Sequence, residues 1–241
     1  MRTSLLFVTA LALLAISCSR QVQAPADNSL SNQERSQGWK LLFDGTSVKG
    51  WRAFNAPTLP EWWIAEDGTL KTLGKGGDIG GDIIYGNETF DNFELSLEWK
   101  LTKGGNSGIF YHVVEGEQYR AAYENAPEYQ VIDDLEFPEP LEGWQRVGAD
   151  YAMYLPDSGK AVKSAGEWNS SRIVFTANKV EYYLNGKLTV SFVPWSQDWQ
   201  ARKVAGKWKE YPDYGLARAG YIGLQDHGSV IQFKNIKIRP L

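Results

Sequence analysis

Two short polar stretches carry the side chains that could move protons. Residues 128–133 read Glu-Tyr-Gln-Val-Ile-Asp, and in a strand the side chains of Glu128 and Gln130 lie on one face. Residues 223–228 read Gly-Leu-Gln-Asp-His-Gly and contain His227, one of 2 histidines in the chain. An imidazole suits proton transfer near neutral pH, so His227 and Glu128 are the candidate catalytic residues. The alternative for His227 is a loop histidine that bonds only to backbone.

Amide and aromatic side chains supply candidates for holding a ligand. Asn106 follows two glycines at the start of a strand, where it either faces a ligand or bonds its own turn. Trp168 and Asn169 combine an indole face, which stacks on the C–H face of a sugar, with an amide that bonds hydroxyls. This mixture suits a carbohydrate, although most tryptophans pack in cores. The candidate substrate-binding residues are Asn106, His112, Gln130, Asp133, Trp168, Asn169 and Gln225.

Several common catalytic motifs are absent from the sequence. It contains no G-x-S-x-G elbow, P-loop, H-E-x-x-H helix or dinucleotide fingerprint. Some lectin-like hydrolases use an E-x-D-x-x-E stretch, and the comparable run here has Glu128, Gln130 and Asp133. Retaining hydrolysis needs two carboxyl groups about 5–5.5 Å apart. Five strand residues span roughly 16 Å, so this run disfavours ordinary double displacement.

Composition limits the class of protein and its partners. The chain has 241 residues, 43% of them hydrophobic and 22% charged, so it can bury a substantial core in one β-type domain. A formal net charge of −4 provides no basic field for phosphate backbones, which excludes nucleic acid as a partner. The single cysteine, Cys18, leaves no disulfide or thiolate metal site for the fold.

Alternation of apolar and polar residues predicts an all-β fold. Residues 92–101 alternate over their whole length, and residues 107–114 follow a Gly-Gly-Asn turn. Asn185-Gly186 predicts a hairpin between residues 179–184 and 187–193. In the last strand, residues 229–238, the apolar parity changes, which predicts a bulge near Asn235. Weaker strands are predicted at 40–43, 62–65, 69–73, 82–85, 129–132, 151–155, 171–177 and 220–225, with one short helix within 196–206. An antiparallel β-sandwich accommodates this pattern.

The amino terminus predicts an export signal and a lipid anchor. Residues 1–17 combine Arg2 with an apolar run too short to span a membrane in the mature protein. Small residues precede Cys18, as in the lipobox of bacterial lipoproteins, so we expect cleavage there and lipidation of its thiol. The alternative is an ordinary secretory signal with an incidental cysteine. Residues 18–37 read as a flexible tether, and residues 38–241 as a single β-sandwich catalytic domain. The expected location is extracytoplasmic, anchored to a bacterial membrane through the lipid alone.

Together these stretches resemble the 3-keto-disaccharide hydrolase domain family, which is widespread in secreted Bacteroidota proteins. The matching segments follow the family order across the folded part of the chain. His112 departs from the family, where an arginine commonly stands, and Lys234 replaces a further arginine. The resemblance implies a jelly-roll sandwich of the concanavalin A-like lectin/glucanase type. The matching segments are residues 39–45, 50–51, 92–95, 106–109, 128–133, 167–169, 223–228 and 233–236.

The resemblance also implies activity on glycosides whose C3 hydroxyl has been oxidised to a ketone. A C3 carbonyl acidifies the C2 proton, so a base can remove it and the C1 oxygen can leave by β-elimination before water adds back. Such a site needs a base, an acid and a donor for the enolate oxygen. The hypothesis gives the base and acid roles to His227 and Glu128 in either order, with Asn106, Gln130 and Asn169 orienting the sugar.

Two other functions and one cofactor stay open at this point. A non-catalytic carbohydrate-binding module needs the same aromatic and amide groups, and a conventional glucan hydrolase could bring together carboxylates from distant segments. The sequence requires no cofactor. Calcium is conceivable because several aspartates offer oxygen ligands, although their spacing is not diagnostic. These aspartates are Asp78, Asp82, Asp133, Asp134 and Asp226.

Overall fold

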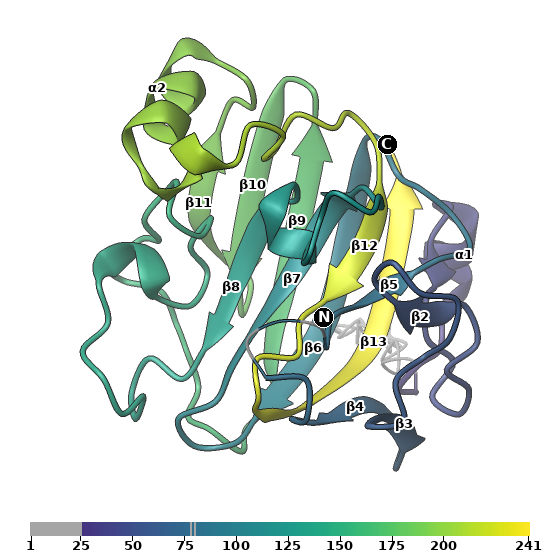
Figure 1. Cartoon of the computed structure of the whole chain (residues 1–241). Helices are drawn as coiled ribbons and strands as arrows, with labels where there is room; N and C mark the ends of the chain where they lie inside the picture. The colour runs from purple at the N-terminus through teal and green to yellow at the C-terminus, as the bar shows by residue number, and fades with distance from the viewer. Residues whose placement is uncertain (1–25, 78, 80) are drawn as a thin grey trace, which may run out of the picture.

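The computed structural model describes residues 26–77, 79 and 81–241, and its strands form two antiparallel sheets that pack against each other (Figure 1). The strands are β1 (Lys40–Leu41), β2 (Trp51–Ala53), β3 (Trp63–Glu66), β4 (Thr69–Leu73), β5 (Ile83–Tyr85), β6 (Phe93–Leu101), β7 (Asn106–Val113), β8 (Glu128–Ile132), β9 (Asn169–Thr176), β10 (Lys179–Leu184), β11 (Lys187–Phe192), β12 (Tyr221–Leu224) and β13 (Val230–Pro240). The helices are α1 (Asn32–Ser36) and α2 (Gln197–Ala205), with short 3-10 turns η1 (Ala122–Glu124), η2 (Gly143–Gln145) and η3 (Lys207–Glu210).

The larger sheet has the order β11-β10-β9-β6-β13-β4-β3, with β1 paired to β13, and the smaller sheet has the order β2-β5-β12-β7-β8. Side chains from both sheets form one buried cluster, which includes Leu97 and Trp99 of β6 and Ile109 of β7. This arrangement confirms the predicted all-β antiparallel sandwich of the jelly-roll, lectin/glucanase type. Some neighbouring strands are distant in sequence, such as β6 and β13 or β12 and β7, so side chains from remote segments meet on one surface.

Local sequence signals account for the most regular parts of the sandwich. Asn185 and Gly186 have φ values of 48° and 79°, as the predicted hairpin between β10 and β11 requires. The predicted bulge in β13 is present, because Asn235 has φ 53° and the pairing with β6 shifts register between Lys234 and Lys237. That shift lets apolar residues of opposite parity on β13 face the same core. The predicted short helix is α2, which Ser196 caps.

Two elements differ from the sequence-based expectation. The strand predicted at residues 151–155 is a turn, since Ala152 has φ 57° and Asp150 and Tyr154 form only an isolated bridge. Strand β2 was not predicted, because its three residues are too short for an alternating pattern to appear.

The described part of the predicted tether is ordered against the larger sheet. Ser31 caps α1 in a capping box, and Glu34 pairs with Lys237 of β13. Asn28 donates its backbone N–H to Asn235 Oδ1 (2.6 Å) and accepts from the Asn235 N–H (2.9 Å). The docked chain therefore begins before residue 38, which corrects the predicted tether over residues 26–37. The predicted signal peptide and Cys18 lie outside the described residues.

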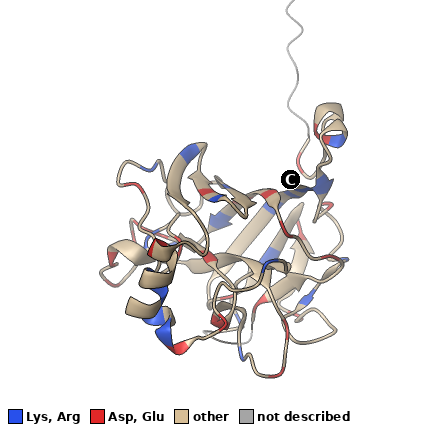
Figure 2. Cartoon of the chain, turned by 90° about the horizontal axis from the view of Figure 1, so that it is seen from above, with Lys and Arg blue, Asp and Glu red and all other residues tan. Residues whose placement is uncertain are grey.

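Acidic and basic side chains are interspersed over the sandwich rather than gathered by sign (Figure 2). Among the residues that the structure describes, no helix has the length and apolar character needed to cross a membrane.

Candidate active site

Gly108 of β7 forms the floor of a hollow on the smaller sheet. Gln130 of β8 pairs with Gly108 on one side, and the N–H of Gln225, just after β12, donates to the Gly108 carbonyl on the other (3.0 Å). A Cβ atom at Gly108 would overlap the carboxyl group of Glu128. The missing side chain therefore leaves the space that the neighbouring polar groups occupy.

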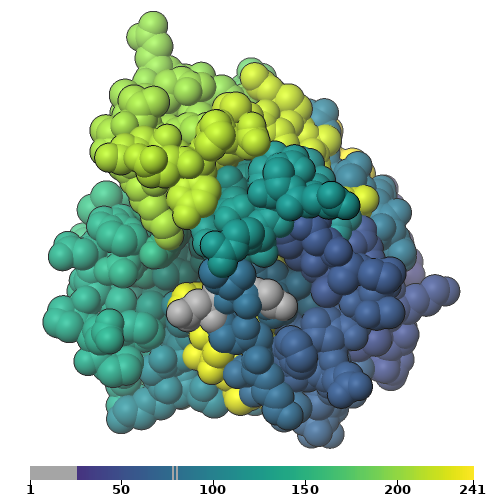
Figure 3. Space-filling model, in the orientation of Figure 1, coloured from purple at the N-terminus to yellow at the C-terminus, as the bar shows by residue number. Residues whose placement is uncertain are grey.

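The hollow is part of a cavity of about 300 Å³, on the face where segments distant in sequence meet (Figure 3). Five predicted site residues line it together, from β7, β8 and the segment after β12. Four further lining residues were not predicted. The nine are Asn106, Glu128, Gln130, Gln225 and His227, with Ile79, Tyr123, Tyr151 and Lys207.

Glu128 is the one carboxylate among the described residues that line this cavity. Only 4% of its surface is exposed, and burial raises its pKa to about 8, with smaller contributions from the charges of Asp82 and Asp150. Lys207 acts in the opposite direction on that pKa but does not outweigh burial. Glu128 is therefore largely protonated at neutral pH, as a carboxyl that acts as a general acid must be.

Lys207 is the functional group that sequence reasoning missed. It begins η3, and its Nζ lies over the rings of Tyr151 (4.5 Å), Trp208 (4.8 Å) and Tyr123 (5.5 Å). Burial lowers the pKa of Lys207, while the charge of Glu128 raises it. No motif marks this lysine, because its place in the cavity depends on how the α2–η3 segment folds back onto the sheet.

Two amide oxygens in the cavity have no hydrogen-bond partner. Asn106 Oδ1 and Gln225 Oε1 are both buried and unpaired. A buried acceptor without a partner costs about 1–3 kcal/mol, so these atoms suit a ligand that brings hydrogen-bond donors. Gln130, by contrast, accepts the backbone N–H of Val131 at 3.2 Å.

Asp226 fixes the loop that carries His227. Its Oδ2 accepts from Thr72 Oγ1 (2.7 Å) and the Gly76 N–H (2.9 Å), and its Oδ1 accepts from the Gly228 N–H (3.0 Å). The backbone N–H of Asp226 donates to Asp82, whose pKa burial raises to about 7, with a smaller contribution from the Asp226 charge. The loop that carries the half-buried His227, between β12 and β13, is therefore held by a carboxylate that does not line the cavity.

The structure corrects the predicted substrate-binding positions of His112 and Asp133. His112 is 2% exposed, its Nε2–H donates to the Asp91 carbonyl (2.9 Å), and its ring contacts Phe175. Its φ of 55° and the register shift between β7 and β12 turn this side chain toward the core. Asp133 instead accepts three backbone N–H groups of the turns on either side of it, so it is a structural residue.

Trp168 and Asn169 also lie away from the cavity. Trp168 faces Lys100 and Lys234, whose Nζ atoms lie 4.9 Å and 4.6 Å from its ring, on the larger sheet. Asn169 is 2% exposed and bonds both backbone groups of Lys163. Neither is therefore a wall of the hollow over Gly108, which corrects their prediction as substrate-binding residues.

The aspartates considered for calcium do not gather into a binding cluster. Within the described ranges, no three His, Cys, Asp or Glu side chains are arranged to hold a metal ion, and Asp78 lies outside those ranges. Asp134 pairs with Lys160 (2.9 Å), and Asp133 is used by backbone. Asp82 accepts the backbone N–H of Asp226 (3.3 Å), which brings those two residues into contact.

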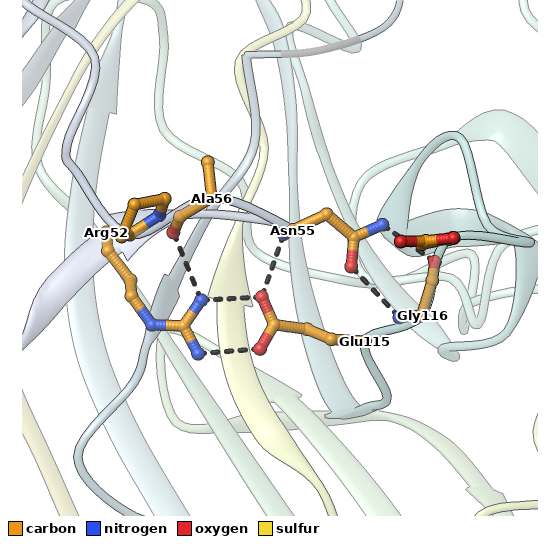
Figure 4. Close-up of a pocket in the computed structure, with 7 residues that line it drawn as sticks. Arg52, Asn55, Ala56, Glu115 and Gly116 are labelled. Atoms are coloured by element: carbon orange, nitrogen blue, oxygen red, sulfur yellow. Dashed lines mark hydrogen bonds and ion pairs between the residues drawn. The ribbon is translucent and has the colours of Figure 1, made fainter.

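A wider cavity of about 620 Å³ opens beside β2, and Figure 4 shows its Arg52 paired with Glu115. Arg52 donates to both carboxylate oxygens of Glu115 (2.5 and 2.6 Å), which also accepts the Asn55 N–H (2.8 Å). The Arg52 contact lowers the pKa of Glu115. This ion pair joins β2 to the loop after β7 and leaves no group poised for proton transfer.

Comparison with known proteins identifies the family. Residues 38–239 match the 3-keto-alpha-glucoside-1,2-lyase-like domain. The chain belongs to this family. It is 33% identical over 253 aligned positions, covering 95% of this chain and 87% of the relative, to a curated 3-keto-disaccharide hydrolase of Bacteroides thetaiotaomicron. It is therefore an enzyme of a hydrolase-like glycosidase family, and a purely non-catalytic sugar-binding module is disfavoured.

Solved structures agree with this assignment. A crystal structure of a candidate glycosyl hydrolase from Parabacteroides distasonis superimposes with a TM-score of 0.84 at 41% identity, over 90% of this chain and 100% of that one. A second candidate glycosyl hydrolase from the same organism gives a TM-score of 0.66 at 29% identity, over 84% of this chain and 99% of that one. Both structures therefore share the fold of this chain over most of its length.

Proposed function

We propose that this enzyme cleaves glycosides whose C3 hydroxyl is oxidised to a ketone, by removing the C2 proton and eliminating the glycosidic oxygen from C1. The observation that carries the proposal is the convergence of Glu128, His227 and the unpaired amide oxygens of Asn106 and Gln225 over Gly108. A cavity of about 300 Å³ lies at the small end of the range for ligand pockets, which suits a short glycoside better than a polymer.

Elimination explains why one carboxyl group is enough. Double displacement at an anomeric carbon needs a second carboxylate about 5–5.5 Å from the first. Among the described lining residues the cavity supplies only Glu128. A ketone at C3 makes the C2 proton acidic, so the reaction needs a base, an acid and an enolate donor instead. The conventional glucan hydrolase is therefore the weaker reading of this site.

The environments of the two catalytic candidates separate their roles. Glu128 has a pKa raised to about 8 and holds a proton at neutral pH, so it acts as the acid toward the departing C1 oxygen. His227 comes from the segment after β12, on the other side of β7 from Glu128, and acts as the base at C2. Two strand spacings separate the backbones of β12 and β8 by about 10 Å, which leaves room for a sugar between the two groups.

The complete cycle conserves protons. His227 takes the C2 proton, the C–H electrons form an enolate at C2 and C3, and its collapse expels the C1 oxygen, which takes the proton of Glu128. This gives the alcohol and a sugar with a C1–C2 double bond. Water then adds its hydroxyl to C1 after giving a proton to Glu128, and His227, whose N–H exchanges with solvent, gives a proton to C2. The sum is hydrolysis, and release before water adds is a lyase reaction.

The amides complete the site by orienting the sugar. Asn106 Oδ1 and Gln225 Oε1 are acceptors without partners, so they bind hydroxyl groups of the sugar rather than its ketone. Gln130 lines the same cavity two residues after Glu128 on β8, and we expect its amide to help orient the ring.

Incubation of the purified enzyme with a 3-keto-glucoside and with its unoxidised parent tests the proposal. We expect cleavage of the keto compound only, with solvent deuterium appearing at C2 of the product. Glu128→Gln and His227→Gln should lose turnover and keep sugar binding. Cleavage of the parent alone would reject elimination, and binding without any turnover would favour a sugar-binding module.

For its location, we propose that the enzyme is extracytoplasmic and held to a bacterial membrane by lipid on Cys18. The support is the sequence of residues 1–18 alone, with its apolar run before a cysteine. Labelling of cells with radioactive palmitate should mark the wild-type chain and not Cys18→Ala, and the variant should leave the membrane fraction. A wild-type protein that retains residues 1–17 and takes up no label would contradict this.

A further inference from the structure

Lys207 lies at the edge of the cavity, where its side chain is exposed overall but its ammonium rests against aromatic rings. It lines the cavity, and its Nζ is within 4.5–5.5 Å of the ring centres of Tyr151, Trp208 and Tyr123. Aromatic faces attract a cation even at an exposed site, and three such rings lie around this ammonium. Trp208 is fully buried and donates its indole N–H to the Tyr151 carbonyl (3.0 Å), so the rings that hold the ammonium are themselves fixed.

Lys207 and Glu128 form a neighbouring pair of donors. Both side chains line the same cavity. The charge of each shifts the pKa of the other in the direction expected of opposite charges, although burial is the larger effect on both groups. Burial keeps Glu128 protonated near neutral pH, so the cavity presents a neutral acid beside a cation. The strand pairing sets Glu128 opposite Phe110 of β7. The backbone N–H of Tyr151, whose ring lies 4.5 Å from Lys207 Nζ, donates to the Glu128 carbonyl (3.0 Å).

The chemistry of a 3-keto sugar requires two neighbouring donors of this kind. The ketone oxygen on C3 and the glycosidic oxygen on C1 are attached to the two carbons that flank C2. A donor to one oxygen and an acid for the other therefore lie close together, with the base at C2. On the basis of the proposed function, we propose that Lys207 is a catalytic residue whose ammonium donates a hydrogen bond to the C3 oxygen and stabilises the enolate that forms there.

The amides of the cavity are less suited to that oxygen. Asn106 and Gln225 present unpaired acceptor oxygens, and their amide N–H donors are neutral, whereas a charged donor forms the stronger hydrogen bond to an enolate oxygen. The ammonium of Lys207 has three donors and no acceptor. In the step itself, His227 takes the C2 proton, the electron pair moves into the C2–C3 bond and the C3 oxygen gains the negative charge. Lys207 keeps its proton and forms no covalent bond.

The test compares Lys207→Met with Lys209→Met, an exposed lysine of the same η3 turn, on two 3-keto-glucosides that differ only in the leaving group. One releases 4-nitrophenol, which needs no acid, and the other releases methanol. We expect Lys207→Met to lower kcat for both compounds by about 10²–10³-fold, as loss of one oxyanion donor does, and to slow C2 deuterium exchange equally. Lys209→Met should match the wild type.

Three results would overturn the role of Lys207. A loss confined to the methyl glycoside would assign Lys207 to the leaving oxygen, and equal activity of variant and wild type would remove it from catalysis. Covalent trapping of the sugar on Lys207 by borohydride would show that Lys207 forms an imine with the ketone instead of acting as an ammonium donor. If Lys207→Met does not fold, as its melting temperature reports, Lys207→Gln takes its place. A wild type that leaves both keto compounds intact would refute the proposed function itself, which separates the two failures.

Discussion

Glu128→Gln tests the acid role of Glu128 through both activity and stability. The amide has nearly the shape of the protonated carboxyl but cannot give its proton to a leaving oxygen. Turnover of a 3-keto-glucoside with a poor leaving group should therefore fall by about 10²–10⁴-fold, the usual contribution of a general acid. The same change should stabilise the fold at neutral pH, because it removes a carboxyl that burial disfavours in its charged form.

The size of this stabilisation follows from the raised pKa. Glu128 has a pKa of about 8 in the folded enzyme against an ordinary value of 4.5, so between these limits folding takes up a proton. A raised pKa means that stability is greatest below the unfolded pKa and falls as the pH rises toward 8. From pH 4.5 to 7 this amounts to about 3 kcal/mol, at about 1.4 kcal/mol per pH unit. The variant does not lose this stability as the pH rises, because its amide does not titrate.

Thermal unfolding at several pH values measures the effect. At about 2–4 °C per kcal/mol for a domain of this size, Glu128→Gln should melt about 6–12 °C above the wild type at pH 7. The difference should shrink toward pH 4.5. Glu139→Gln, at an exposed position, serves as the matched control and should melt with the wild type at every pH.

Two outcomes would refute this reasoning. A variant that melts below the wild type at pH 7, or whose gain does not change with pH, would mean that burial does not raise the pKa of Glu128. A variant that melts higher and still cleaves the poor leaving group at the wild-type rate would mean that another group is the acid.

The remaining predictions concern the frame of the site. Gly108→Ala should lower kcat/KM by about 100-fold, since its Cβ displaces the Glu128 carboxyl, and a folded variant with full activity would contradict the geometry. Asp226→Asn should lower the free energy of unfolding in urea by about 1–3 kcal/mol, and it should also lower turnover because Asp226 holds the loop that carries His227. A change in only one of these two measurements would contradict this role. Trp168→Ala should leave kcat and KM unchanged in steady-state assays, because Trp168 lies on the larger sheet away from the cavity.

The sequence predicted what local chemistry determines. Alternation located β6, the Asn185-Gly186 pair located the β10–β11 hairpin, and the change of parity located the bulge at Asn235. Each of these signals acts through backbone conformation or through one face of one strand. The same parity rule placed Glu128 and Gln130 together, and both line the cavity.

Errors arose where contacts between distant segments decide the structure. Parity alone would turn His112 toward the cavity, but the irregular pairing of β7 with β12 turns it into the core. Asn169 had the right chemistry for a sugar, yet Lys163 takes its amide. Lys207 carried no signal at all, because its role depends on the rings that surround it in space.

The two sheets differ in how they contribute to stability, and this difference explains how the fold tolerates buried carboxyl groups. The smaller sheet carries Glu128, and Asp82 lies beside it, with both pKa values raised mainly by burial. Each of these carboxyls weakens the fold at neutral pH, as Glu128→Gln should reveal. The larger sheet compensates, since the core faces of β6 and β13 are apolar along their length. The groups that lower stability are therefore confined to a few positions on the smaller sheet, and the apolar core lies behind these positions.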